Sequence, residues 1–405
     1  KYARVVIERS QVSQNRDFLT KPINDSSGIQ RTGCQRLLSL CMTRRATITG
    51  WGKCLPPVKL TNADLEHLVD TDDRWIVERT GIKSRSINHM QTTDMAEVAA
   101  LHALAAAGLE ATDIDLIIMA TVSPEITCPS NACHLQARLG AVNAAAFDLN
   151  AACSGFVYAA ITASSMIASG VKQRVLVVGA EQLHWVMDYW DRNTCILFGD
   201  GAGAAIFESS TNGDGMLGAD LGADGPAGST MVIESLGTRY NLIEGRDPAT
   251  SRLHFEGKAV FKIAVQGIAA SVRQALDQAG VSADDVNLVV PHQANERIIN
   301  AAARRLGIGL DRVMINIADH GNTAAASVPM ALCDAANTGR ITPGDLVVMT
   351  AFGGGVTWAS AVFRWGQRVT AVGTSDAALP PTDATVFELL AANREFFAPL
   401  HSGDA

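Results

Sequence analysis

Cys153 is a candidate nucleophile in this 405-residue sequence. It follows a short strand expected to end near Leu149, and the run at 154–169, rich in Ala, Ile and Met, predicts a helix that ends at Gly170. A thiol at a helix N-terminus faces unpaired N–H groups and the positive end of the helix dipole, which stabilise a thiolate. We therefore expect the pKa of Cys153 to lie below the usual value of about 8.5. The segment alone is equally compatible with a buried structural cysteine.

His292 and Asn322 are the next candidates, because each lies beside the end of an expected element. His292 comes directly after the apolar stretch 288–291, which predicts a buried strand, and layered α/β folds bind ligands at the carboxyl ends of their strands. A hydrogen-bonded structural histidine would explain this position as well. Asn322 lies between Gly321 and a run of small residues that begins a helix, and its amide could donate to a carbonyl oxygen.

Two glycine-rich segments and the spacing of the cysteines indicate which other kinds of site to expect. Three glycines at 353–355 follow an expected strand, so a backbone N–H there could hold an oxyanion, or the segment could be a tight turn. The segment 198–203 leads into a strand and lacks the spacing of a dinucleotide loop, which favours packing. The eight cysteines show no metal-ligand spacing, so we expect no metal, no disulfide framework and a reducing cytoplasm.

Residues 103–118 (ALAAAGLEATDIDLII) and 275–290 (ALDQAGVSADDVNLVV) form an internal repeat, although two ordinary αβ units could also converge on such residues. Each copy predicts a helix that ends at a glycine, Gly108 or Gly280, and a buried strand after it. We expect two α/β halves, 45–220 and 221–365, with mainly parallel strand pairing and the active site at their junction. The same offset places Asn322 close to the counterpart of Cys153.

The net charge restricts the kinds of partner, and both ends of the chain differ in composition from the part between them. The net charge of −8 argues against a nucleic-acid binder, and no apolar run is long enough to cross a membrane. Residues 1–44 are expected to be a disordered non-core extension, with Met42 as the natural start or a floppy arm as the alternative. Residues 366–405 predict a linker and a short amphipathic helix, capped by Thr382 or Asp383, that docks on its own core or binds a partner.

The motifs together resemble the β-ketoacyl-acyl-carrier-protein synthase III family of the thiolase superfamily. The resemblance covers about residues 45–365 and rests on TNADL (61–65), WIVERTGI (75–82), ACSGF (152–156), FGDGAG (198–203), PHQAN (291–295), HGNT (320–323) and FGGG (352–355). It implies an α/β, duplicated thiolase-like fold with five αβαβα layers, a cytoplasmic homodimer, and no cofactor, since acyl-CoA is a substrate.

The same resemblance implies a two-step acyl transfer that initiates fatty-acid synthesis. Cys153 takes the acyl group from acyl-CoA, while the N–H groups of Cys153 and Gly354 form the oxyanion hole. His292 and Asn322 then donate to the thioester oxygen of malonyl-acyl carrier protein as carbon dioxide leaves, and the carbanion attacks the acyl-cysteine to give a 3-oxoacyl product.

The resemblance also assigns binding residues, for which a core anchor and a solvated helix face are the plainer alternatives. Trp75, Arg79 and Arg192 would bind CoA; Lys262, Arg297, Arg304 and Arg305 would dock the carrier protein; and Cys128 and Phe198 would bound the acyl pocket. Because Cys128 is small where a bulky aromatic residue is common, we expect longer or branched primers to fit.

Some departures from the family keep other functions open. Asn193 lies where family members often have glycine, and Lys258 lies where they often have asparagine. The segment 184–190 is also unusually aromatic. A condensing or acyltransfer enzyme of a specialised polyketide or signal-molecule pathway is therefore the alternative. A non-catalytic scaffold subunit is disfavoured because Cys153, His292 and Asn322 are all present, and a degradative thiolase because Cys333 lies within an ordinary helix pattern.

Overall fold

The computed structural model describes residues 44–234 and 247–402. All elements below belong to one compact unit, Thr43–Ala405. The expected N-terminal extension and Met42 lie outside the described residues, apart from Arg44. Within the described ranges, no helix has the length and apolar character needed to span a bilayer.

Two mixed sheets form the framework. The first has the order β1 (Arg45–Cys54), β7 (Gly201–Ser210), β6 (Arg174–Glu181), β4 (Leu116–Ala120), β5 (Ala145–Leu149). The second has the order β11 (Leu288–Pro291), β12 (Leu346–Gly353), β13 (Thr357–Arg364), β8 (Gly215–Ala223).

The expectation of mainly parallel pairing is wrong. β4 pairs in parallel with β5 and β6, and β11 with β12, but the other pairs in both sheets are antiparallel. The three residues 354–356 join β12 to β13, and a connection this short permits only a hairpin. The division expected near residue 220 falls within β8, which is a strand of the second sheet.

The internal repeat has the same structure in both halves. In the first copy α4 (Thr92–Ala107) leads through a 3₁₀ turn to β4, and in the second α8 (Gly257–Ala279) leads through a 3₁₀ turn to β11. Gly108 and Gly280 cap the two helices in the left-handed conformation, each with a φ of 69°. The predicted helix ends and strands are therefore confirmed, because only glycine takes this conformation without strain.

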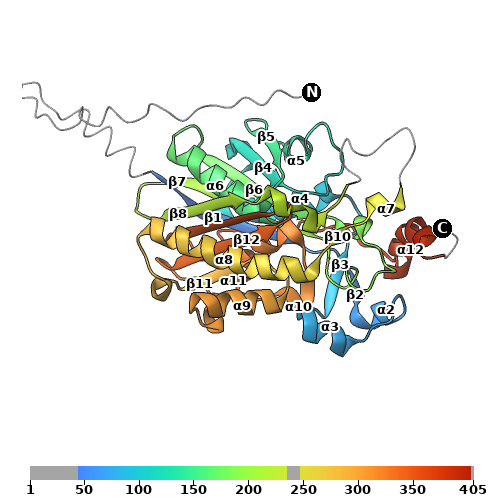
Figure 1. Cartoon of the computed structure of the whole chain (residues 1–405). Helices are drawn as coiled ribbons and strands as arrows, with labels where there is room; N and C mark the ends of the chain where they lie inside the picture. The colour runs from blue at the N-terminus through green and yellow to red at the C-terminus, as the bar shows by residue number, and fades with distance from the viewer. Residues whose placement is uncertain (1–43, 235–246, 403–405) are drawn as a thin grey trace, which may run out of the picture. The chain divides into compact units, whose positions relative to one another are not determined.

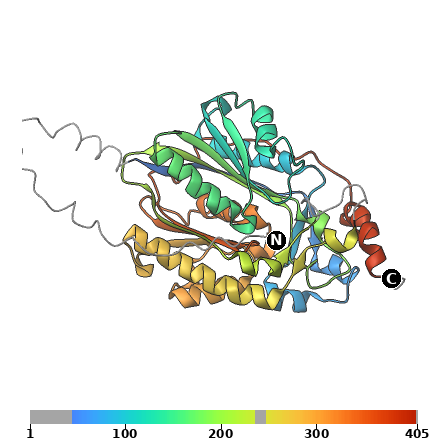
Figure 2. The same ribbon diagram turned by 45° about the horizontal axis from the view of Figure 1, so that its top comes forward.

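The helices and sheets stack in five layers (Figures 1 and 2). The outer faces are covered by α4 with α5 (Asn131–Leu139) on the first sheet and by α8 with α9 (Glu296–Leu306) on the second. Two apolar helices, α6 (Gly155–Ala168) and α11 (Ser327–Asn337), lie between the sheets. The expected αβαβα order is thus confirmed.

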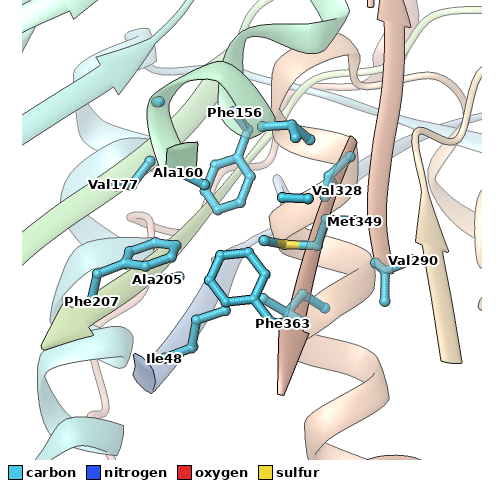
Figure 3. Packing of buried hydrophobic residues seen from close by; sticks show 14 of the residues in the cluster. Ile48, Phe156, Ala160, Val177, Ala205, Phe207, Val290, Val328, Met349 and Phe363 are labelled. Atoms are coloured by element: carbon cyan, nitrogen blue, oxygen red, sulfur yellow. The ribbon is translucent and has the colours of Figure 1, made fainter. Parts of the chain in front are cut away.

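The central layer joins the two halves into one core. Along β4, Ile118 packs on this central core while its neighbour Ile117 packs under the outer helices, as the alternation of side chains in a strand requires. Phe207 of the first sheet and Phe363 of the second meet between the sheets, with ring centroids 6.0 Å apart (Figure 3). The core therefore belongs to neither half alone.

Shorter elements complete the fold. They are β2 (Val58–Thr61), α2 (Asn62–Glu66), α3 (Asp73–Thr80), β3 (Ser84–Ile87), β9 (Met231–Val232), α7 (Pro248–Ser251), β10 (His254–Phe255) and α10 (Ile317–His320). After β13 the chain reaches α12 (Val386–Phe397). Thr385 caps this helix together with Glu388, so the prediction of Thr382 or Asp383 as the cap is wrong.

Candidate active site

Cys153 lies in a strained turn at the start of a central helix. The 3₁₀ turn η2 (Ala152–Ser154) leads directly into α6, and Ala152 has a φ of 47°, which side-chain-bearing residues rarely adopt. The thiol is almost fully buried and lines the main cavity. Such strain persists only where the surrounding structure enforces it, and it is concentrated at functional sites.

The acidity of Cys153 differs from our expectation. Burial and, to a smaller extent, the Glu181 carboxylate raise the pKa of the thiol to about 12, and a backbone hydrogen bond offsets only part of this rise. The predicted lowering is therefore wrong for this structure, because a helix start stabilises a thiolate less than the loss of water destabilises it. At neutral pH the group is a thiol, so its proton has to leave during any attack.

The end of β12 lies against the backbone of Cys153. A Cβ atom placed on Gly353 would lie 2.7 Å from the Cys153 nitrogen and 2.9 Å from the Ser154 nitrogen, so only glycine fits there. Gly354 follows directly and lies beside Ala152, with 3.6 Å between an added Cβ and that of the alanine. The glycine segment therefore lies beside the nucleophile, and a role of the Gly354 N–H in an oxyanion hole stays a prediction.

His292 follows β11 and is held by hydrogen bonds from both sides. Its backbone N–H donates to the Thr350 carbonyl at 2.8 Å, and its Nδ1 lies 2.6 Å from the Ser327 hydroxyl. Burial lowers the pKa of the imidazole to about 3, so it is neutral at pH 7. The sequence reasoning did not identify Ser327 as this partner.

Asn322 has its amide oriented by its own backbone. Its Oδ1 accepts from the Ala324 N–H at 2.9 Å, which leaves the Nδ2 group to donate elsewhere. The Asn322 N–H donates to the Leu197 carbonyl, and the Gly199 N–H donates to the Asn322 carbonyl. These bonds tie Asn322 to the segment that carries Phe198.

One cavity of about 760 Å³ brings the three candidate residues together. Cys153 comes from the first half, and His292 and Asn322 come from the second, so the cavity lies at the junction of the halves. Its other lining residues include Trp75, Arg79, Asn193, Phe198, Lys258, Asn295 and Arg297. This volume is within the range of small-molecule sites.

Trp75 lines this cavity beside two arginines. It lies in α3, and the guanidinium carbons of Arg79 and Arg192 are each 4.3 Å from the centroid of its ring. The Arg192 Nη1 also donates to the Asp70 carbonyl at 2.6 Å. The structure therefore groups the three residues expected at the nucleotide end.

Most of the remaining predicted residues lie away from the cavity wall. Cys128 is exposed and does not line the cavity of its own chain. Lys262, Arg304 and Arg305 are exposed on α8 and α9, and of the four predicted docking residues only Arg297 lines the cavity. Arg304 and Arg305 lie in the last turn of α9, where cations also favour the helix dipole.

A buried arginine that the sequence reasoning missed supports one cavity wall. Arg85 is fully buried, its Nε donates to the Ile196 carbonyl at 3.0 Å, and its Nη1 donates to Asn62 Oδ1 at 2.6 Å. Ile196 lines the cavity beside Phe198. No cluster of three potential metal ligands occurs among the residues that the structure describes.

The five layers and the junction cavity define the class of the protein, a thiolase-like condensing enzyme. Family models described as 3-oxoacyl-[acyl-carrier-protein] synthase III match residues 147–225 and, for its C-terminal part, residues 276–365.

Similar proteins and solved structures show to which family within this class the chain belongs. A Vibrio cholerae protein named β-ketoacyl-[acyl-carrier-protein] synthase III 2 is 45% identical over 85% of this chain and 95% of its own. A Roseiflexus castenholzii β-ketoacyl-[acyl-carrier-protein] synthase III is 48% identical over 80% of this chain and 99% of its own. The Aquifex aeolicus 3-oxoacyl-[acyl-carrier-protein] synthase III structure has a TM-score of 0.74 at 44% identity, covering 79% of this chain and 100% of that one. The chain belongs to the β-ketoacyl-[acyl-carrier-protein] synthase III family.

Proposed function

We propose that the protein condenses an acyl-CoA primer with malonyl-acyl carrier protein and so initiates fatty-acid synthesis. The observation that carries this proposal is the one cavity that Cys153, His292 and Asn322 line together with Trp75. The names of the relatives support the same reaction. The proposed reaction needs no resident cofactor or metal, because acyl-CoA is a substrate.

In the first step the sulfur of Cys153 attacks the thioester carbon of acyl-CoA. The Cys153 Sγ–carbon bond forms, the bond from carbon to the CoA sulfur breaks, and the thiol proton ends on the CoA thiolate. Because burial keeps the thiol protonated and His292 neutral, the imidazole is free to relay this proton. The backbone N–H groups of Cys153 and Gly354 would bind the oxyanion.

In the second step malonyl-acyl carrier protein replaces CoA. The bond to its carboxylate breaks, carbon dioxide leaves, and the resulting carbanion attacks the acyl carbon on Cys153 to form a carbon–carbon bond. The bond from this carbon to Cys153 Sγ breaks, and the released thiolate takes a proton from water. His292 and the Asn322 Nδ2 group would donate to the thioester oxygen that gains charge. A histidine with a pKa of about 3 does so without a cationic proton that would quench the carbanion.

The tautomer of His292 has to change between these steps, and Ser327 permits this change. The Ser327 hydroxyl accepts from the Gln293 N–H at 3.3 Å and retains its own proton and a second lone pair. It can therefore accept from His292 Nδ1 in the first step, when Nε2 takes the proton. It can donate to Nδ1 in the second step, when Nε2–H is the donor.

The partner assignments follow from the surface of the protein. Adenine would stack on Trp75 in place of a guanidinium, and the exposed Lys262, Arg297, Arg304 and Arg305 would attract an acidic carrier protein. The edge strand β5 supports a homodimer, because no described strand pairs with its outer side and its apolar residues are partly exposed. Cys128 would then bound the partner's acyl pocket.

The described cysteines, all free thiols, support a cytoplasmic location.

A specialised pathway is the second candidate. The priming β-ketosynthase of the R1128 polyketide pathway matches with a TM-score of 0.75 at 33% identity, covering 80% of this chain and 97% of that one. The same site would then load a different primer. A degradative thiolase stays disfavoured, because Cys333 is buried within α11.

Acylation followed by product analysis tests both candidates. The protein is incubated with acyl-CoAs of different length, the acylated residue is found by mass spectrometry, and malonyl-acyl carrier protein is then added. We expect acyl transfer to Cys153, release of carbon dioxide and a 3-oxoacyl product. Transfer to oxygen or nitrogen without decarboxylation would favour the specialised pathway, and strict preference for acetyl-CoA would reject the expectation of longer primers.

A further inference from the structure

The segment that follows β13 runs back across the protein to one end of the fold. The Val372 N–H donates to the Ala106 carbonyl and the Gly373 N–H to the Ala105 carbonyl, at 3.0 and 3.1 Å, so the segment runs along α4. α12 then packs against η3 (Leu183–Val186), β2 and α7. Figure 1 shows α12, in red, beside α7 at this end.

α12 holds the segment 184–190 by hydrogen bonds and by ring contacts. The Nδ2 group of the buried Asn393 donates to the carbonyls of His184 and Trp185, at 2.9 and 3.2 Å. The Trp190 Nε1 donates to the Arg394 carbonyl at 3.2 Å, and the Arg394 guanidinium lies 4.5 Å from the Trp190 ring centroid. These contacts fix the backbone at the start of the segment and the side chain at its end.

A residue beyond the helix adds a third contact. His401 Nε2 lies 2.8 Å from Oδ2 of the buried Asp188, and the His401 ring stacks on Trp190 with centroids 5.9 Å apart. The segment 184–190 is therefore held at its start, middle and end by residues between 393 and 401.

The braced segment continues directly into the nucleotide end of the cavity. Asp191 and Asn193 line the cavity, and Arg192 lies between them against Trp75. One residue separates Trp190 from Arg192, so a movement of the Trp190 backbone has to move Arg192 as well. The matched family region ends at residue 365, so α12 lies outside it.

We propose that residues 386–401 form a brace that positions Arg192 and its neighbours for CoA, with Asn393 and Arg394 as positioning residues. This inference rests on the proposed function, because it takes Trp75 and Arg192 as the nucleotide site. The brace acts on the nucleotide end of the substrate and leaves the chemistry at Cys153 unchanged.

Two acyl donors separate this role from a general stabilising role. Acyl-CoA carries the nucleotide, whereas the S-acyl-N-acetylcysteamine thioester presents the same reacting carbon without it. We expect Asn393→Ala and Arg394→Ala each to raise the KM for acyl-CoA about fivefold, the size of one lost hydrogen bond or ring contact. Their kcat with acyl-CoA and their kcat/KM with the small thioester should equal those of the unmodified protein.

Glu395→Ala is the matched control, because Glu395 is an exposed neighbour on the same helix. It should leave the kinetics with both donors unchanged. If Asn393→Ala lowers the melting temperature into the assay range, Arg394→Ala decides the comparison, since it leaves both Asn393 bonds intact.

Trp75→Ala, measured in parallel, separates a failed brace from a failed nucleotide site. If Trp75→Ala impairs acyl-CoA alone while the two brace variants impair both donors equally or neither, the brace is overturned and the nucleotide site stands. If Trp75→Ala does not distinguish the donors, the assignment of the nucleotide site fails, and the brace proposal fails with it.

Discussion

Asn150 and Asn322 make the same hydrogen bond in the two halves of the fold. Each Oδ1 accepts from the backbone N–H two residues later, that of Ala152 at 3.2 Å and that of Ala324 at 2.9 Å. Ala152 and Ala324 are the described non-glycine residues with positive φ, 47° and 43°. The internal repeat therefore extends into the site, and the counterpart of Asn322 is Asn150, three residues before Cys153.

Replacing each asparagine should affect a different half-reaction. Asn150→Ala releases the turn that carries Cys153, so acylation by acyl-CoA should slow by about tenfold, the cost of one bond that holds a strained residue. Asn322→Ala should leave acylation near its normal rate and slow condensation by about 10²–10³-fold, as the loss of a charge-stabilising donor does. Single-turnover acylation and product formation measure the two steps. Equal losses in both steps for both variants would contradict this division.

Gly353→Ala should abolish most activity while the protein still folds. The added Cβ would lie 2.7 Å from the Cys153 nitrogen, so β12 or the nucleophile turn has to move. We expect acylation to fall by at least about 10²-fold, because a displaced oxyanion donor costs this much. Gly225→Ala is the control, since an added Cβ there meets nothing within 4 Å. Normal acylation by Gly353→Ala would show that the backbone adjusts.

His292 should make the stability depend on pH below neutrality. Burial depresses its pKa from 6.5 to about 3, so the unfolded chain binds the proton more readily than the folded one. Its contribution is present above pH 6.5 and is lost as the pH falls toward 3, by up to about 1.4 kcal/mol per pH unit. His292→Asn should flatten the free energy of unfolding over this window, measured by urea denaturation. Parallel curves for both proteins would mean that the imidazole is charged in the folded state.

Ser327→Ala should slow the reaction by removing the group that orients His292. The Nδ1 atom loses its partner at 2.6 Å, so we expect decarboxylation of malonyl-acyl carrier protein to fall about tenfold. Ser360→Ala is the matched control: it removes a buried hydroxyl that bonds the Thr350 hydroxyl at 2.8 Å and makes no bond to the imidazole. The two variants should lose similar stability, and only Ser327→Ala should lose rate. A similar loss of rate in both would assign Ser327 a packing role.

Much of the fold follows from local pattern. The glycines at 108 and 280 and the β-branched runs after them fix helix ends and buried strands within a few residues. The position of β8 in the second sheet does not follow, because its pairing with β13 depends on residues more than a hundred positions away. The other antiparallel strand pairs could not be predicted either, because the internal repeat covers only one helix and one strand in each half.

The candidate site was predictable in its residue types and less so in its energetics. The helix start at Cys153 suggested an acidic thiol, but both halves bury that thiol, and burial is a property of the assembled layers. The role of Ser327 as the partner of His292 could not be predicted by comparing the two halves, since its counterpart in the first half is Gly155, which carries no hydroxyl. Arg85 lies far in sequence from the Ile196 carbonyl that it supports, so no motif links them.

The central helices also decide how the chain can be divided. α6 and α11 pack on each other and on both sheets. Either half expressed alone would therefore expose a large apolar surface to water. Severing the polypeptide between β7 and β8 should therefore yield two fragments that precipitate separately and regain solubility only when produced together.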